Sequence, residues 1–179
     1  MSTELPTARS AIMKRVNVTV VAATYNEKFT TPLLENCLDE LEDALPLSKI
    51  TLVRVPGSYE VPVMVKRAIE LGDARPDVVI GLGLIVRGST AHADLIGAAI
   101  TQQLMSIACE TMVPVIHEVL LLDTEEQAFA RCIAAKLNRG REAARAAAAM
   151  VEAMEDLASG RSDALTDRRT RQLDMDPLR

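Results

Sequence analysis

The sequence predicts an α/β protein built on a doubly wound, four-stranded parallel sheet with helices on both faces. Four short apolar runs rich in Val, Ile and Leu are separated by segments with helical periodicity. Runs of this kind, apolar without alternation, are typical of parallel strands that are buried on both faces. Each helical segment is long enough to cross back over the sheet, and right-handed crossovers of this kind place helices on both of its faces.

The apolar runs and their punctuation define the strands and the first helix. The four strands are expected at Val16–Thr24, Ile50–Val55, Val78–Val86 and Val113–Leu122. The first helix is predicted to start after Thr31, a good N-cap residue, with Pro32 at its first position, and to end before Pro46. The third strand contains Gly81 and Gly83, which indicates that another group packs closely against its backbone.

The remaining helices are marked by spacing and by capping residues. Apolar residues at helical intervals predict helices over Glu60–Leu71 and His92–Thr111. The capping box Thr124–Gln127 opens another helix. A last, Ala-rich helix is expected from Asn138 to the stop at Gly160. Its apolar face comprises Ala143, Ala147, Met150, Val151 and Met154.

The length of 179 residues suits a single domain with one substantial core. We expect this domain over residues 15–160, after an N-terminal segment at 1–14 that could pair with the sheet edge of a neighbouring subunit. Residues 161–179 are dense in charges of both signs, which predicts a flexible tail.

Composition disfavours several classes of function. A net charge of −5 argues against nucleic-acid binding, and the apolar runs fall short of the roughly 20 residues that span a bilayer. The N-terminal residues have no apolar signal segment, so a cytoplasmic location is expected. The three cysteines, Cys37, Cys109 and Cys132, are widely spaced within helical patterns, which predicts reduced, buried thiols rather than disulfides or a metal site.

Polar residues gather where three of the predicted strands end, which is the edge where doubly wound sheets bind their ligands. The segments concerned are Tyr25-Asn26-Glu27, Gly57-Ser58-Tyr59-Glu60 and Arg87-Gly88-Ser89-Thr90-Ala91-His92. At Ser89 and Thr90, backbone N–H groups, two hydroxyls and a helix N-terminus would converge, which suits a phosphate. Arg87 adds a positive charge nearby. The alternative is an ordinary Ser/Thr helix cap.

His92 lies in the first turn of the same helix. An imidazole with a pKa of about 6.5 can accept and donate a proton near neutral pH. On its own, a histidine at a helix start is more typical of the surface or of a cap, but beside a phosphate site a general acid and base is the favoured interpretation.

The two tyrosines also stand at strand ends. Tyr25 and Tyr59 could stack on a planar ring or, alternatively, cover the core. Asn26, Glu27 and Glu60 offer hydrogen bonds to a polyol or a heterocycle, although helix starts that face solvent have the same composition. Two histidines without ligand partners at suitable spacing disfavour a metal centre.

Together these motifs resemble one family, the 6,7-dimethyl-8-ribityllumazine synthases, over roughly residues 16–154. The motifs are Ala23–Glu27, Val55–Pro62, Gly83–Asp94, Glu110–Ile116, Glu126-Gln127-Ala128 with Arg131, and Asn138-Arg139-Gly140. The resemblance implies a flavodoxin-like fold and a step of riboflavin biosynthesis. In that step 5-amino-6-ribitylaminopyrimidinedione condenses with 3,4-dihydroxy-2-butanone 4-phosphate to give the lumazine, phosphate and water, with no cofactor and no metal.

The resemblance also implies roles for individual residues. His92 matches the proton-transfer residue. Ser89 and Thr90 match the phosphate turn, and Arg131 matches the arginine that binds phosphate from the neighbouring subunit. The pyrimidine and its ribityl chain would be bound by Tyr25, Asn26, Ser58, Tyr59, Glu60 and His117.

The chain departs from the family's pattern at several positions. His117-Glu118 stands where the family usually has Phe-Gly, and Leu121, Ala91 and Arg139 replace the usual Thr, Pro and Lys. Members form pentamers or icosahedral shells of pentamers, so a homo-oligomer of one of these kinds is implied. The alternatives are a non-catalytic flavin- or lumazine-binding shell protein and an FMN electron carrier of flavodoxin type. The hydroxyl-rich phosphate loop that an FMN carrier would have after its first strand is missing here.

Overall fold

The computed structural model describes residues 5–8, 10–72 and 74–161, which form one parallel four-stranded sheet. Its strands are β1 (Asn17–Ala23), β2 (Lys49–Val55), β3 (Val78–Val86) and β4 (Val115–Leu122). Their order is β2-β1-β3-β4, and every neighbouring pair is parallel. The predicted doubly wound α/β class is therefore confirmed.

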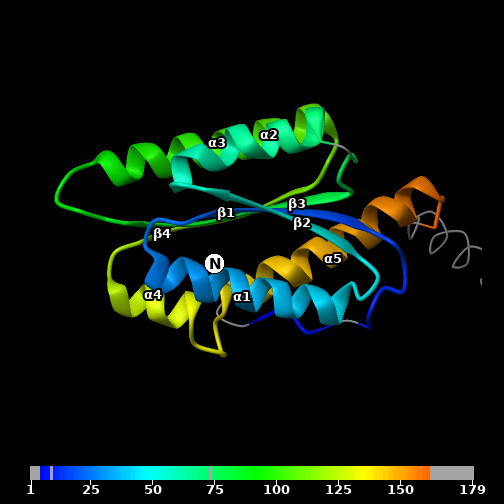
Figure 1. Ribbon diagram of the computed structural model, residues 1–179, viewed down its shortest axis with the longest axis horizontal. Coiled ribbons are helices and arrows are strands. Elements are labelled where there is room, and N and C mark those ends of the chain that lie inside the picture. Colours follow the sequence, from blue (N-terminus) through cyan, green and yellow to red (C-terminus); the bar gives the residue numbers. More distant parts are fainter. Residues whose placement is uncertain (1–4, 9, 73, 162–179) are drawn as a thin grey trace, which may run out of the picture.

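Helices cover both faces of the sheet (Figure 1). One layer holds α2 (Val61–Leu71) and α3 (His92–Thr111); the other holds α1 (Glu27–Ala44), α4 (Glu125–Cys132) and α5 (Arg139–Ala158). A short 3-10 turn, η1 (Ser58–Glu60), precedes α2. Among the described residues no helix is long and apolar enough to cross a membrane.

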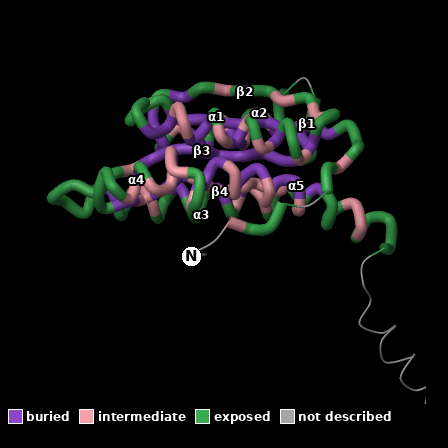
Figure 2. The backbone as a smooth tube through the Cα atoms, turned by 90° about the horizontal axis from the view of Figure 1, so that it is seen from below, coloured by how far each residue is buried: buried purple, intermediate pink, exposed green. Residues whose placement is uncertain are grey.

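The core consists of two clusters, one on each face of the sheet. Alternate residues of β3 show the division, since Ile80 and Leu82 pack with α1 and α5 whereas Val79 packs with α2 and α3. The central strands β1 and β3 are buried along most of their length, and exposed residues dominate the edge strand β2 (Figure 2). Burial on both faces explains why β1 and β3 read as continuous apolar runs.

The first helix begins earlier than the sequence indicated. It starts at Glu27 rather than after Thr31, and Asn26 precedes it in the left-handed conformation with φ 62°. Pro32 therefore lies inside the helix, where it gives up one backbone hydrogen bond. The prediction was wrong because Thr31-Pro32 has the composition of a helix start, whereas Phe29 and Thr30 are already buried in helical register.

The later helices follow the prediction closely. α3 spans His92–Thr111 as expected, and the Thr124 hydroxyl accepts a hydrogen bond from the Gln127 amide at the start of α4. Asn138 caps α5 by accepting from the Arg141 amide. On α5, Ala143, Ala147 and Val151 are buried as predicted, but Met150 and Met154, which were predicted on the same face, are more than a third exposed.

Two of the three cysteines occupy the predicted environment. Cys37 and Cys132 are buried free thiols, and burial raises the pKa of each to about 12. Cys109 is also free but is exposed on α3, so its predicted burial was wrong. Its helical spacing is compatible with either face, because α3 is largely apolar around its whole circumference.

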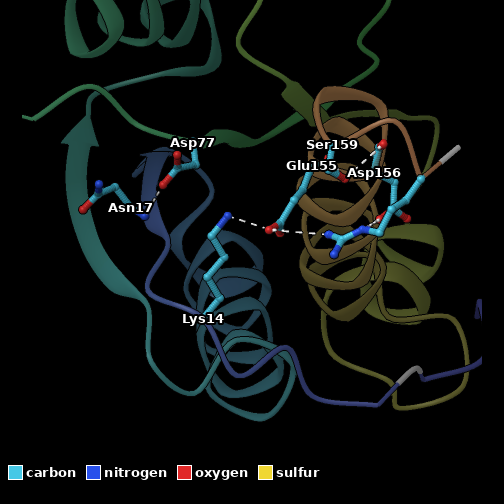
Figure 3. A network of polar contacts seen from close by, with 7 residues as sticks. Lys14, Asn17, Asp77, Glu155, Asp156 and Ser159 are labelled. Carbon is cyan, nitrogen blue, oxygen red and sulfur yellow. Dashed lines mark hydrogen bonds and ion pairs between the residues drawn. The ribbon is translucent and has the colours of Figure 1, made fainter.

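The described residues before β1 lie along α1 and α5 of the same chain. The Ile12 amide donates to the Ala44 carbonyl at 2.9 Å, and the Lys14 ammonium lies 3.2 Å from the Glu155 carboxylate (Figure 3). Pairing of this segment with a neighbouring subunit stays a prediction. The predicted tail at 161–179 lies, beyond residue 161, outside the described residues.

Candidate active site

The loops after β1 and β2 are joined at the carboxyl edge of the sheet. The Thr24 amide donates to the Val55 carbonyl at 2.9 Å, and the Tyr25 amide donates to the Pro56 carbonyl at 2.8 Å. The Thr24 hydroxyl also donates to Pro56 at 3.1 Å. These bonds fix the backbone of Tyr25, while its side chain is 66% exposed and presents a ring to solvent.

Both loops also rest on β3. The Asn26 side-chain amide donates to the Leu84 carbonyl at 3.2 Å, and the Ser58 hydroxyl donates to the same oxygen at 3.4 Å. Gly83 makes this contact possible, since a Cβ there would lie 2.5 Å from the Ser58 hydroxyl oxygen. The close backbone approach expected at the third strand is therefore present, and its partner is a candidate site residue.

The turn at η1 is closed by Glu60. Its carboxylate accepts a hydrogen bond from the Gly57 amide at 2.9 Å. A Cβ at Gly57 would lie 3.0 Å from that carboxylate and 3.1 Å from the Tyr25 ring, so the ring packs directly over the turn. Tyr59 follows the buried Ser58 in this turn and is 63% exposed. The Tyr25 ring and the Glu60 carboxylate thus both lie against Gly57, in the turn that also holds Ser58 and Tyr59.

The candidate phosphate loop connects β3 to α3. Residues Gly88 to Ala91 are exposed, and in Figure 1 the green loop after β3 extends beyond the carboxyl ends of the strands. Ser89 and Thr90 lie in this loop, and His92 is the first residue of α3 and is exposed. The N-terminal amides of a helix of 20 residues therefore stand next to two hydroxyls and an imidazole.

Arg87 does not have the role that its position suggested. Its guanidinium is paired with Asp94 in the first turn of α3 and with Asp123 just after β4. The hydrogen bonds that Arg87 donates to these two carboxylates raise its pKa. The positive charge of Arg87, which was expected to act on a bound phosphate, is thus already balanced by two carboxylates. Asp123 was missed as a partner because 36 residues separate it from Arg87 along the chain.

His117 lies in the middle of β4, not at the carboxyl edge. It is opposite Gly81 in the register, five residues and roughly 16 Å before the end of the strand at Leu122. Its Nδ1 accepts from the Val119 amide at 3.1 Å, and Nε2 lies 2.8 Å from the Thr101 hydroxyl. Burial lowers the pKa of His117, which favours the neutral ring.

The proton on the His117 ring can be assigned from its partners. The Thr101 hydroxyl donates to the Gly97 carbonyl at 2.8 Å, so it is free to accept from Nε2–H. Nδ1 must be unprotonated to accept from Val119. Both ring nitrogens are thus bonded to neighbours in mid-strand. Held in this position, His117 lies apart from the other site candidates of its own chain.

Arg131 also lies apart from the phosphate loop of its own chain. It is half-buried in the last turn of α4, and α4 and α3 cover opposite faces of the sheet (Figure 1). A phosphate held at Ser89 would need an arginine from another copy of the chain if Arg131 is to contact it.

Glu118 replaces a small residue of the motif and points to the face opposite His117. Burial, and next the charge of Glu142, raise the pKa of Glu118 to about 7, while Arg139 acts in the opposite direction. Arg139 is itself buried and forms an ion pair with Glu142. Two of the departures from the motifs, Glu118 and Arg139, thus belong to one charged cluster between β4 and α5.

Comparison with known proteins agrees with this geometry. Residues 15–155 match the family model of 6,7-dimethyl-8-ribityllumazine synthase. A 6,7-dimethyl-8-ribityllumazine synthase of Salinibacter ruber is 41% identical over 77% of this chain and 88% of its own length. Proteins of the same name from Thermococcus gammatolerans and Protochlamydia amoebophila are 36% and 32% identical, over 82% and 81% of this chain and 92% and 84% of their own lengths. The chain belongs to the 6,7-dimethyl-8-ribityllumazine synthase family.

Proposed function

We propose that this protein condenses 5-amino-6-ribitylaminopyrimidinedione with 3,4-dihydroxy-2-butanone 4-phosphate, forming 6,7-dimethyl-8-ribityllumazine, phosphate and water. The observation that carries the proposal is the carboxyl edge of the sheet, where the η1 turn and the loop before His92 both adjoin the end of β3. Membership of the family supports the same activity.

The pyrimidine is bound by the surface built from the first two loops. The ring of Tyr25 stacks on the heterocycle, and Asn26, Ser58, Tyr59 and Glu60 hold the pyrimidine and its ribityl chain. Several of these side chains are already anchored, because Asn26 and Ser58 bond to Leu84 and Glu60 bonds to Gly57. A preformed surface of this kind orients one reactant before the second arrives.

The phosphorylated substrate binds at Ser89 and Thr90. Backbone amides and the start of α3 stabilise the dianion, first in the substrate and then as it leaves. His92, exposed and next to this loop, moves protons during imine formation, phosphate elimination and ring closure. None of these steps changes the oxidation state of a protein group.

The complete site includes a second copy of the chain. Arg131 of a neighbouring subunit contacts the phosphate, and the neighbour's His117 borders the pyrimidine. Exposed apolar side chains on α2, on α3 and just after α3 support an assembly of this kind, since exposed apolar surface is typical of contacts between subunits. They are Val63, Leu71, Leu95, Met105 and Met112. We infer a pentamer or an icosahedral shell of pentamers in the cytoplasm, with residues 1–14 on a neighbour's sheet edge.

The direct test mixes purified protein with both substrates and follows lumazine absorbance. A rate well above that of the spontaneous reaction is expected. Arg131→Ala should raise KM for the phosphorylated substrate, whereas His92→Ala should mainly lower kcat. Tight lumazine binding without turnover would reject the enzymatic proposal.

A further inference from the structure

Arg87 links three elements around the candidate phosphate loop. Its backbone amide donates to the Leu122 carbonyl at 2.8 Å, which continues the pairing of β3 with β4 by one residue. Its Nε and Nη2 donate to the same oxygen of Asp94, at 3.1 and 2.5 Å, and Nη1 donates to Asp123. One side chain therefore joins the end of β3, the start of α3 and the segment that leads into α4.

The loop itself has little else to hold it. Residues Gly88 to Ala91 are exposed, and a Cβ at Gly88 would meet no atom within 4 Å. Ala91 precedes α3 without a side-chain hydrogen bond to cap it. Because packing does not fix the loop, its position depends on its two ends, and Arg87 and Asp94 are the residues that tie those ends together.

The ion pairs are exposed, so their importance does not lie in stability. The side chains of Arg87, Asp94 and Asp123 are 41, 50 and 54% exposed. Surface ion pairs of this kind contribute little to folding. A planar guanidinium that bonds two carboxylates at once nevertheless fixes their relative orientation more strictly than a lysine would.

The same group of residues is continuous with the helix that carries Arg131. The Asp123 amide donates to the Gln127 side chain at 3.0 Å, and the Gln127 amide donates to Thr124, which closes the first turn of α4. Arg131 follows one turn later. The Arg87 contacts thus connect a chain's own phosphate loop to the arginine that it would offer to its neighbour.

Charge gives Arg87 a second effect. Asp94 and Asp123 place two carboxylates beside a loop that is to bind a dianion. Arg87 offsets one of these charges, and without it the pair would repel the substrate, most strongly at low ionic strength.

We propose that Arg87 is a positioning residue for the lumazine-forming reaction: it holds the phosphate loop and His92 in place through Asp94, and sets both relative to α4 through Asp123. This inference rests on the proposed function. It predicts that Arg87 acts on use of the phosphorylated substrate and hardly at all on the pyrimidine, whose surface is held by separate contacts to Leu84 and Pro56.

The kinetic test compares Arg87→Met with Arg75→Met. Arg75 is an exposed arginine that bonds the Thr111 carbonyl at the opposite ends of the same two elements, β3 and α3, so it is a matched control. Arg87→Met should raise KM for the butanone phosphate and lower kcat, each about tenfold, and leave KM for the pyrimidine within about twofold. The Arg75 variant should behave as wild type.

Two further variants separate charge from position. The triple change Arg87→Met, Asp94→Asn, Asp123→Asn removes the repulsion but not the loss of orientation, so KM should return toward wild type while kcat stays low. Arg87→Lys should likewise recover KM more than kcat. Wild-type kinetics in Arg87→Met, or equal increases in KM for both substrates, would overturn the proposal.

A measurement without substrates distinguishes this inference from the proposed function. Amide hydrogen exchange over residues 88–95 should be faster in Arg87→Met than in wild type and in Arg75→Met. Unchanged exchange would refute the positioning role even in an active enzyme. Faster exchange in a protein that forms no lumazine would reject the proposed function instead.

Discussion

Neighbouring residues of β4 serve opposite layers of this protein. His117 faces α3 and is held as a neutral ring by Thr101 and Val119, whereas Glu118 faces α5 and lies near the ion pair of Arg139 with Glu142. Alternation along a strand thus separates two titratable side chains by the thickness of the sheet. Burial is the main cause of both pKa shifts, and it lowers the pKa of His117 but raises the pKa of Glu118.

Glu118 should make the protein less stable as the pH rises. Its folded pKa of about 7 exceeds the ordinary value of 4.5, so the folded state binds more protons between these values and loses stability as they are released. Glu118→Gln should therefore raise the thermal midpoint at pH 8, because it increases the free energy of unfolding by about 1–3 kcal/mol. Near pH 4.5 the substitution should have little effect. Glu35→Gln, at an exposed position of α1, is the control. A benefit independent of pH would contradict this account.

Elements of the fold place the site residues through a few tight contacts. β3 supplies the Leu84 carbonyl to both binding loops, and Ser58 can reach it only because Gly83 has no side chain. The position of Ser58 therefore depends on the composition of β3.

Gly83→Ala should disturb the pyrimidine surface. The new methyl group would lie 2.5 Å from the Ser58 hydroxyl, so Ser58 must move and its bond to Leu84 is lost. Overpacking of this kind costs about 1–3 kcal/mol. Calorimetry should show a lower thermal midpoint, and kinetics should show a higher KM for the pyrimidine. Gly88→Ala, where nothing lies within 4 Å, should leave both values unchanged.

The two capped helices offer a comparison of buried and exposed caps. Asn138 is fully buried, accepts from the Arg141 amide at 3.2 Å and donates to the Cys132 carbonyl at 3.1 Å. Asn138→Ala should cost about 2–4 kcal/mol, because it removes a cap and leaves a buried carbonyl without this donor. Thr124→Ala, at an exposed cap, should cost about 1 kcal/mol. Equal losses in thermal stability would show that burial of the cap is unimportant.

What the sequence could predict depended on whether the signal was local. α3 was predicted in full because His92–Thr111 combines helical spacing with clear boundaries, and the Thr124 cap is a short-range motif. α1 was misjudged because tertiary burial of Phe29 outweighed the local composition of Thr31-Pro32. Arg87 and Asp123 are 36 residues apart in the sequence, so no local pattern could predict that they pair.

At the scale of the whole molecule, one chain supplies only part of the proposed site. Tyr25, Asn26, Ser58 and the loop before His92 share the carboxyl edge, but Arg131 is in the opposite helix layer from α3 and His117 is in mid-strand. The family motifs predicted both residues and implied that Arg131 acts from a neighbouring subunit, and the predicted strand Val113–Leu122 already contained His117. The exposed β2 edge and the apolar surface of α2 and α3 are the features through which a second copy would complete the site.

Mixed assemblies provide the sharpest test of this shared site. If Arg131 acts across a subunit boundary, co-assembly of His92→Ala with Arg131→Ala chains creates some sites with an intact His92 from one chain and an intact Arg131 from the next. Random mixing in equal amounts should restore about a quarter of wild-type activity, since each site draws one residue from each of two chains in a closed ring. Each variant assembled alone is the control and should show low activity. If co-assembled chains, verified by tags on each, gain nothing over these controls, Arg131 acts within its own chain and the two-subunit site is wrong.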